Sequence, residues 1–432
     1  MNWFTAFNAL AVQFTLGSPV LLYAKSLGAT ATVLGVIASL APLLTVCQIP
    51  AAHFMARVGY RRFIFYGWGL RTVCIFLLAV VPLMDFIGAA GKLLIMLLAL
   101  FVFNLLRSIS LGAWLPWLTD LIPEEVRGRF LSRDQIFLHA GFLVSLGLGA
   151  VMLYGQATKV QFTLLFFVGA VATVASLLFL RTIPDAGAGE AVKRSGKSVP
   201  WREIVFYPPF FRLVVFTVLV ATSYSTGGIF GVPFMKSRLG FSDSRIMLYG
   251  VFYFAGALAS LPFLGRVLER TGSKLVLQVT MGIFCLLQAA WWLISADMLA
   301  PSVTLIVSLH FMAGIAGANF GLALTRLMMN TMPSMGRSHF FAFFSVITSL
   351  GAGLAPILWG IMIDALNHLD SAAGPLNWNK YSIYYLAVLV ITILTWAYAF
   401  FLHEKESPAG RLSIRDLLLT MKLKRLSRFW MR

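Results

Sequence analysis

Residues 56–63 read ARVGYRRF and place three arginines in a short gap between two long apolar stretches. A related gap, ERTGSKLV, follows at residues 269–276. Each stretch beside the first gap has about 20 residues, enough to cross a bilayer core as a helix. Basic residues gather in short cytoplasmic loops, and the glycines of the gaps, Gly59 and Gly272, permit a tight turn. We therefore predict that both gaps are cytoplasmic turns between antiparallel transmembrane helices.

The whole chain has the composition of a membrane protein. Of its 432 residues, 59% are hydrophobic and only 12% are charged, against about 25% charged in soluble domains. Lipid permits a spanning segment only if its backbone hydrogen bonds are satisfied internally, which favours helices. The sequence therefore predicts an all-α membrane protein with twelve transmembrane helices, at residues 4–24, 32–55, 63–84, 93–119, 134–155, 160–181, 210–235, 246–266, 274–296, 302–330, 339–366 and 380–402.

The net charge of +18 is explained by this topology. With both termini in the cytoplasm, 25 of the 34 basic residues lie on the cytoplasmic side, seven lie outside, and Arg71 and Arg107 lie within spans. The asymmetry follows the positive-inside rule, so the charge does not indicate a nucleic-acid partner. The cysteines, Cys47, Cys74 and Cys285, fall inside spans without ligand spacing. We expect no metal site, no cofactor and no disulfide.

The two gaps belong to a longer internal repeat. Three short motifs recur in the same order at nearly constant offset, which indicates two homologous, pseudo-symmetric six-helix bundles. The matched pairs are Gly17 with Gly231 (214 apart), Gly59 with Gly272 (213 apart) and Pro123 with Pro333 (210 apart). We predict an N-terminal bundle at 1–182, a cytoplasmic linker at 183–207 that is rich in glycine, serine and charge, a C-terminal bundle at 208–402 and a basic cytoplasmic tail at 403–432.

Over its whole length the chain resembles the major facilitator superfamily of secondary transporters, in its bacterial type. The loop pattern of that family is G-x-x-x-D-R-x-G-x-R/K. Residues 265–274 fit it with Glu269 in place of Asp, whereas residues 52–61 depart from it, with Ala52 at the first position and Ala56 at the acid. The resemblance implies two bundles that rock around a site near the midplane and expose it alternately to each side.

The resemblance also implies a cytoplasmic charge latch between this loop and an acid at the end of the fourth helix. Asp120 occupies that helix end in the first half, while the second half keeps the loop acid instead. The alternative is that these charges are solvated loop residues without a gating role, since surface ion pairs contribute only about 0–1 kcal/mol. The predicted gating residues are Arg57, Gly59, Arg61, Asp120, Glu269, Arg270 and Gly272.

Polar residues in the middle of spans are the candidates for a solute site, because they are expensive in lipid. Arg107 lies deep in the span 93–119 with Asn104 on the same helical face, while the acids near spans lie toward span ends. A deep cation without a carboxylate partner favours an anionic solute. The alternative for Arg107 is a structural arginine satisfied by helix carbonyls, and a structural role is what we predict for Arg71.

Two further spans contribute candidates. The span 210–235 has a polar run at 222–228 that ends in two glycines, and the pseudo-equivalent first span has a Gly17–Pro19 kink after Gln13. His310 lies near the midplane, so a proton is a candidate coupling ion; the alternative is a hydrogen-bonded packing residue. The predicted substrate-binding residues are Gln13, Asn104, Arg107, Ser223, Tyr224, Thr226, His310 and Asn319.

The sequence thus predicts a monomeric secondary transporter of the cell inner membrane, not an enzyme, that moves a small organic solute by alternating access. An efflux antiporter for drugs or metabolites is an alternative, although residues 140–149 lack the Gly-Pro pair of the family's antiporters. Alternatives of another class are a transport-dead scaffold or sensor and a polytopic membrane enzyme. In the tail, Leu419, Leu423, Leu426 and Trp430 recur at helical spacing among basic residues, which predicts a helix on anionic lipids.

Overall fold

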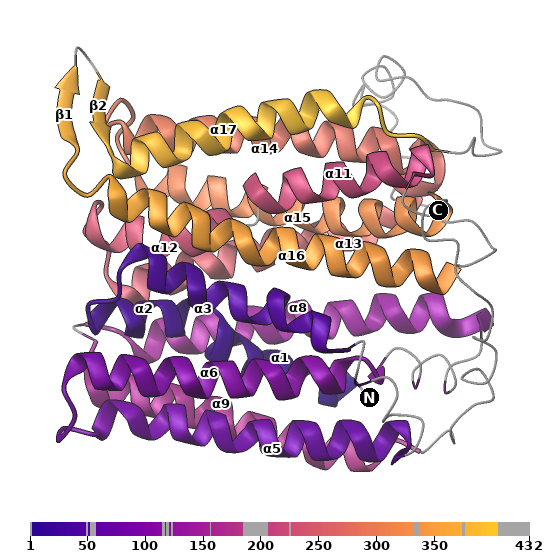
Figure 1. The fold of residues 1–432 in the computed structure, drawn as a ribbon, viewed down its shortest axis with the longest axis horizontal. Coiled ribbons are helices and arrows are strands. Elements are labelled where there is room, and N and C mark those ends of the chain that lie inside the picture. Colours follow the sequence, from indigo (N-terminus) through magenta and orange to yellow (C-terminus); the bar gives the residue numbers. More distant parts are fainter. Residues whose placement is uncertain are drawn as a thin grey trace.

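The computed structural model is almost entirely helical (Figure 1). It describes residues 2–48, 51, 58–114, 117, 121, 124–155, 157–184, 206–223, 226–331, 337–373 and 376–404. Those residues contain eleven helices long and apolar enough to cross a membrane, together with a shorter apolar helix at Ala31–Cys47. The shorter helix lies where the second span is predicted. The predicted helical membrane fold is therefore confirmed.

The first half of the chain forms α1 (Asn2–Leu16), α2 (Ser18–Ser26), α3 (Ala31–Leu44), the 3-10 turn η1 (Thr45–Cys47), α5 (Tyr60–Val80), the 3-10 turn η2 (Val81–Leu83), α6 (Ala89–Leu111), α8 (Glu124–Met152) and α9 (Lys159–Arg181). The second half forms α11 (Pro208–Ser223), α12 (Gly227–Ser237), α13 (Asp243–Thr271), α14 (Ser273–Ser295), α15 (Val303–Thr331), α16 (Arg337–Ala365), β1 (Asp370–Ala373), β2 (Leu376–Asn379) and α17 (Lys380–Ala399). In Figure 1 the indigo-to-magenta helices of the first half lie below the orange and yellow helices of the second.

The two loops that contain the repeated gap both turn at their glycine. Gly59 has φ 86° directly before α5, and Gly272 has φ 79° directly before α14. A residue with a Cβ rarely adopts such a positive φ, so glycine is the residue that permits this entry into the helix. The internal repeat seen in the sequence therefore corresponds to a repeated turn geometry.

The first predicted span is broken into two helices. Gly17 separates α1 from α2, and Pro19 lies in the first turn of α2, where its missing N–H costs nothing. In the second half α11 ends at Ser223 and α12 begins at Gly227, and residues 224–225 between them are outside the described part of the chain. The residue that matches Gly17 in the repeat, Gly231, lies inside α12.

The two halves contact each other at the end of the molecule that carries β1 and β2, called here the hairpin end (Figure 1). The carboxylate of Asp364, at the end of α16, accepts hydrogen bonds from the backbone N–H groups of Ala31 (2.9 Å) and Thr32 (2.8 Å), which begin α3. The first N–H groups of a helix lack partners within it and attract an anion. On the other side of the interface, the hydroxyl of Ser244 on α13 donates to the carbonyl of Ala150 on α8 at 2.6 Å.

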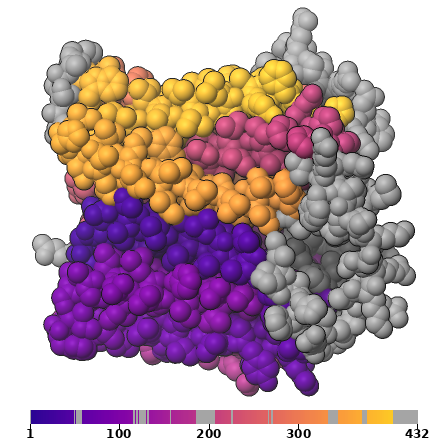
Figure 2. All heavy atoms as spheres, in the orientation of Figure 1, coloured from indigo at the N-terminus to yellow at the C-terminus, as the bar shows by residue number. Residues whose placement is uncertain are grey.

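Small residues allow α16 and α3 to approach closely along the same interface. A Cβ added to Gly35 would lie 2.3 Å from the carbonyl oxygen of Pro356, and one added to Gly360 would lie 2.6 Å from that of Ala31. Close approach through small residues is a common way to pack helices in lipid. In the space-filling view, the indigo surface of the first half meets the orange surface of α16 directly (Figure 2).

The strands β1 and β2 form an antiparallel hairpin that the all-α prediction did not include, with Asp370 opposite Asn379. Its residues join the loops of the second half to one another. Asn377 donates to the carboxylate of Asp297 at 2.8 Å, and Arg238 donates to the same carboxylate at 2.8 Å. The side chain of Asn379 caps α17. The hairpin thus ties three helix connections together at one end of the bundle.

Candidate functional site

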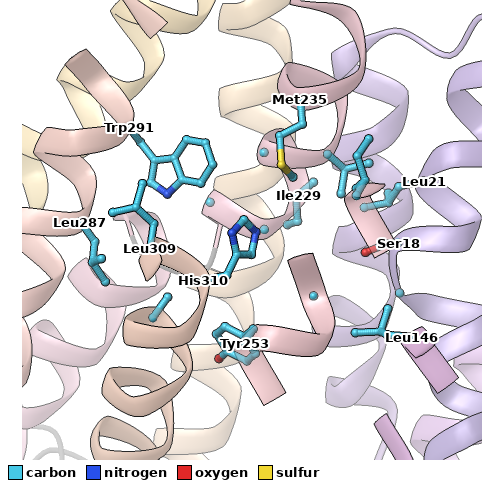
Figure 3. A pocket seen from close by; sticks show the side chains of 18 of the residues that line it. Ser18, Leu21, Leu146, Ile229, Met235, Tyr253, Leu287, Trp291, Leu309 and His310 are labelled. Atoms are coloured by element: carbon cyan, nitrogen blue, oxygen red, sulfur yellow. The ribbon is translucent and has the colours of Figure 1, made fainter. Parts of the chain in front are cut away.

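A cavity of about 410 Å³ lies between the two halves. Its walls come from α1, α2 and α8 of the first half and from α12, α13, α14, α15 and α17 of the second (Figure 3). It lies beside the break between α1 and α2, because Gly17 and Ser18 line it on one side, and Gly227 and Gly228 at the start of α12 line it on the other. Membrane transporters of many folds bind their solutes at discontinuous helices of this kind, where backbone groups are released from the helix.

The break between α1 and α2 requires its glycine. Gly17 donates its N–H to the carbonyl of Gln13 at 3.0 Å. A Cβ at this position would lie 2.5 Å from that carbonyl and 2.4 Å from the side-chain Nε2 of Gln13. The glycine therefore allows the Gln13 amide to fold back beside the break, and Gln13 itself lines the cavity.

Aromatic rings form one wall of the cavity. The Trp291 and Tyr385 rings stack at 6.1 Å with an interplanar angle of 15°. The indole of Trp291 meets the His310 imidazole edge-on at 5.7 Å. Figure 3 shows the His310 ring between Trp291 on one side and Ser18 and Leu21 of the other half. The second half thus presents aromatic rings to the cavity beside His310, and Ser18 and Leu21 of the first half lie opposite.

The hydrogen bond of His310 defines which ring nitrogen is available to a ligand. Nδ1 lies 2.9 Å from the carbonyl oxygen of Ile306, one turn earlier on α15. Because a carbonyl only accepts, Nδ1 carries the hydrogen, and Nε2 of the neutral ring is then an acceptor. The Tyr249 ring stacks on the imidazole at 5.6 Å. His310 is therefore held in one orientation, and the described residues leave its Nε2 without a hydrogen-bond partner.

Gln288 is a cavity residue that the sequence reasoning missed. It lies on α14, its side chain is only 6% exposed, and its Oε1 has no hydrogen-bond partner. Its Nε2 faces the start of α12, 3.6 Å from the position that a Cβ on Gly227 would take. A glutamine in the middle of the predicted span 274–296 was the available signal, since mid-span polar residues tend to face a cavity. Trp291 and Tyr385 carried no such signal, because aromatic residues are common throughout the chain.

The structure brings together two of the predicted substrate-binding residues, Gln13 and His310, in the cavity lining. Asn104 is fully buried on α6, where its Nδ2 donates to the Leu100 carbonyl, and Arg107 on the same helix is not among the lining residues. Thr226 lies 2.9 Å from the Tyr384 hydroxyl. The remaining predictions lie elsewhere or outside the described residues: Ser223, which donates to the Leu219 carbonyl, Asn319, whose buried Oδ1 has no partner, and Tyr224, which is not described.

Arg71 makes its contacts within the first half, in line with the structural role that the sequence predicts, although its buried Nε has no hydrogen-bond partner among the described residues. Its Nη2 donates to Oδ1 of Asn8 at 2.6 Å, and its guanidinium lies 4.5 Å from the centre of the Trp68 ring and 5.6 Å from that of Phe103. A buried cation gains about 2 kcal/mol from such contacts with aromatic faces when it is desolvated. Arg71 therefore joins α5 to α1 and α6.

Part of the predicted latch lies outside the described residues. Arg57 and Asp120 are not described, and neither are the side chains of Glu269 and Arg270. Arg61 donates to the carbonyl of Arg181 at 2.5 Å, at the end of α9. A cation at a helix C-terminus is favoured by the free carbonyls there. The latch therefore stays a prediction.

Among the described residues, no three histidine, cysteine, aspartate or glutamate side chains lie close enough to hold a metal ion.

A bundle of apolar helices in two halves around a central, solute-sized cavity defines a membrane transporter. The sequence matches the Major Facilitator Superfamily over residues 3–297 and 218–431. The chain therefore belongs to the Major Facilitator Superfamily.

Solved transporters share this fold at low sequence identity. A point mutant of the nucleoside transporter NupG is 12% identical with a TM-score of 0.71, over 93% of this chain and 99% of that one. The D-xylose-proton symporter is 15% identical with a TM-score of 0.70, over 95% and 97%. The inward open xylose transporter XylE from E. coli is 12% identical with a TM-score of 0.68, over 97% and 98%. Comparison with curated proteins found no sequence match.

Proposed function

We propose that the protein is a secondary transporter that moves a small organic solute by alternating access, and that the solute binds in the cavity beside the α1–α2 break and the start of α12. The observation that carries the proposal is the position of this cavity, which has walls from both halves and lies beside the α1–α2 break and the start of α12. A solute held there contacts both halves at once. Rocking of the halves would then expose it to either side in turn.

We further propose that the hairpin end faces the outside of a cell inner membrane, so that the structure corresponds to an inward-facing state. The contacts of Asp364 with α3 and of Ser244 with Ala150 close this end. Several basic residues at this end pair with nearby carboxylates, which suits the outer side of the membrane, where few unpaired cations are expected. The ion pairs are Asp85 with Lys92 and Lys159, Lys236 with Asp243, and Arg238 with Asp297.

Asp85 shows how these pairs remove free positive charge. It lies in the loop before α6, and its hydrogen bond with Lys159 lowers the pKa of its carboxyl below the ordinary value. The carboxylate is ionised at neutral pH and offsets one of the two positive charges of its lysine partners. Four of the seven basic residues that the sequence places outside take part in such pairs.

The preference for an anionic solute depends on Arg107, which does not line the cavity. The proposal is therefore a small organic solute, and Arg107→Lys is the variant that tests the anionic preference. It keeps the charge but loses the planar fork that binds carboxylate or phosphate, so it would weaken binding of an anionic solute and of no other class. A proton is the proposed coupling ion, with His310 as the titrating group.

The proposal is tested by counterflow in proteoliposomes, after a thermal-shift screen of metabolites has found a solute that stabilises the purified protein. We expect accumulation of that solute, weakened by Gln13→Leu, and a pH dependence that disappears in His310→Gln. A solute that stabilises the protein but shows no counterflow would instead indicate a sensor. Counterflow with an unchanged pH profile in His310→Gln would remove only the coupling role of the histidine.

A further inference from the structure

We infer that the cavity recognises an uncharged solute that has a flat apolar face and hydrogen-bond donors, and that Gln288 accepts one of its hydrogen bonds. This inference rests on the proposed function, because it names the solute class of the same site. Three observations carry it: the charge of the lining, its aromatic wall, and two acceptor atoms that the described residues leave without a donor.

Among the described residues, the cavity lining holds no aspartate, glutamate, lysine or arginine. Its polar members are amides, hydroxyls and the His310 imidazole, and the rest are glycine, aliphatic and aromatic residues. A charge moved from water into such a site loses its hydration and finds no opposite charge to replace it. An uncharged solute avoids this penalty. The lining therefore selects against anions and cations alike.

The aromatic wall favours a solute with a flat face. Trp291 and Tyr385 are nearly parallel, and Tyr253, Phe254 and Phe284 also line the cavity. Rings of this kind bind flat apolar surfaces through large contact areas at low conformational cost. The volume of about 410 Å³ is in the range of small-molecule pockets, which is about 300–1,000 Å³. A heteroaromatic ring or the apolar face of a cyclic solute fits both facts.

Two acceptors in the lining call for donors from the solute. Oε1 of Gln288 is buried without a partner, although nearly all buried polar atoms in proteins have one. Nε2 of His310 is the second, because Nδ1 already donates to Ile306. An N–H or O–H of the solute would satisfy each acceptor. The absence of such a donor would leave a buried polar atom unpaired, which is how sites of this kind discriminate.

The test measures which members of a defined mixture the purified full-length protein retains, read by mass spectrometry. The mixture contains uridine and a matched set built on one ring, in which only the end group differs: tyrosol (uncharged), 4-hydroxyphenylacetate (anionic) and tyramine (cationic). Gln288→Leu removes the acceptor and Gln288→Glu replaces it by a charged one. Gln278→Leu is the control, since Gln278 is buried on the same helix but does not line the cavity.

We expect the wild type and Gln278→Leu to retain the uncharged members above the charged ones. Gln288→Leu should weaken that retention about tenfold or more, as for a site whose hydrogen-bond partner is lost. Gln288→Glu, which keeps the shape of the side chain, should shift the preference to tyramine. Stronger retention of a charged member by the wild type, retention of no uncharged member, or equal retention in Gln288→Leu would overturn the inference. Counterflow of a charged solute would overturn the inference about the solute class but leave the proposed transport function standing. Retention of a solute without counterflow of any solute would instead overturn the proposed transport function.

Discussion

At the scale of single residues, glycines set how closely α15 and α13 approach beside the cavity. A Cβ added to Gly314 would lie 1.7 Å from the carbonyl oxygen of Tyr253, and one added to Gly256 would lie 2.1 Å from that of Phe311. These neighbours are backbone atoms, which cannot turn aside as a flexible side chain could. Because Tyr253 and His310 line the cavity on these two helices, the glycines also determine the width of the site.

Gly314→Ala is expected to destabilise the protein and to reduce transport together. The added methyl group forces two backbones apart, and overpacking of this kind costs about 1–3 kcal/mol. Gly321→Ala on the same helix is the matched control, since nothing lies within 4 Å of a Cβ there. Thermal denaturation in detergent measures the difference. A melting temperature of Gly314→Ala equal to that of Gly321→Ala would contradict the close packing of α13 and α15.

At the scale of elements, a helix end in one half is capped by a carboxylate from the other. Asp364 closes the start of α3 through two backbone N–H groups, and this contact joins the halves at the hairpin end. A comparable cap lies within the second half, where the carboxylate of Glu404 accepts from the backbone N–H groups of Ser273 and Lys274 at 2.8 Å each. Only the first cap has to break when the halves separate.

Asp364→Asn is expected to shift the population toward a state opened at the hairpin end. Hydrogen bonds to a charged group contribute about 1.5–3 kcal/mol, so losing that charge should change the ratio of the two states about tenfold. Spin labels on Ser26→Cys and His368→Cys, one on each half, would report a longer distance. Asp85→Asn is the control, because Asp85 pairs with Lys92 and Lys159 inside the first half. An unchanged distance distribution in Asp364→Asn would show that the cap does not hold this end closed.

At the scale of the whole molecule, the two halves form one interface that carries both the closure and the site. The cap and the Ser244 contact lie at the hairpin end, and the cavity lies between the halves beside the α1–α2 break. Under the proposed function, a rotation of one half against the other would change access to the cavity. This coupling is what alternating access requires.

The orientation of the molecule in the membrane is tested by cysteine labelling in a background without Cys47, Cys74 and Cys285. Ser195→Cys lies in the predicted linker and Ser371→Cys lies in β1. An impermeant reagent applied to intact cells should label Ser371→Cys, and it should label Ser195→Cys only after permeabilisation. The physical reason is the excess of basic residues on the side of the linker. Labelling of Ser195→Cys in intact cells would reverse the proposed topology.

Local properties of the sequence were sufficient to predict the helices, the repeat and the glycine turns. Span length and apolarity are properties of consecutive residues, and a positive φ at Gly59 and Gly272 is a preference of the residue itself. The kink at Gly17 was also predictable, because Pro19 follows it within the same span. Each of these features depends on the chain near one point.

The residues of the cavity were decided by the tertiary structure. In a span that is apolar on all sides, the sequence does not show which face meets the other half, so Trp291 and Tyr385 could not be told from lipid-facing rings. Arg107, which the sequence favours for the site, does not line the cavity, while Gln288 of α14 does. Asp364 reads as an acid at a span end, and only the packing of α16 on α3 makes it a cap. Which groups meet across an interface depends on how two halves of the chain pack together, and no local pattern contains that information.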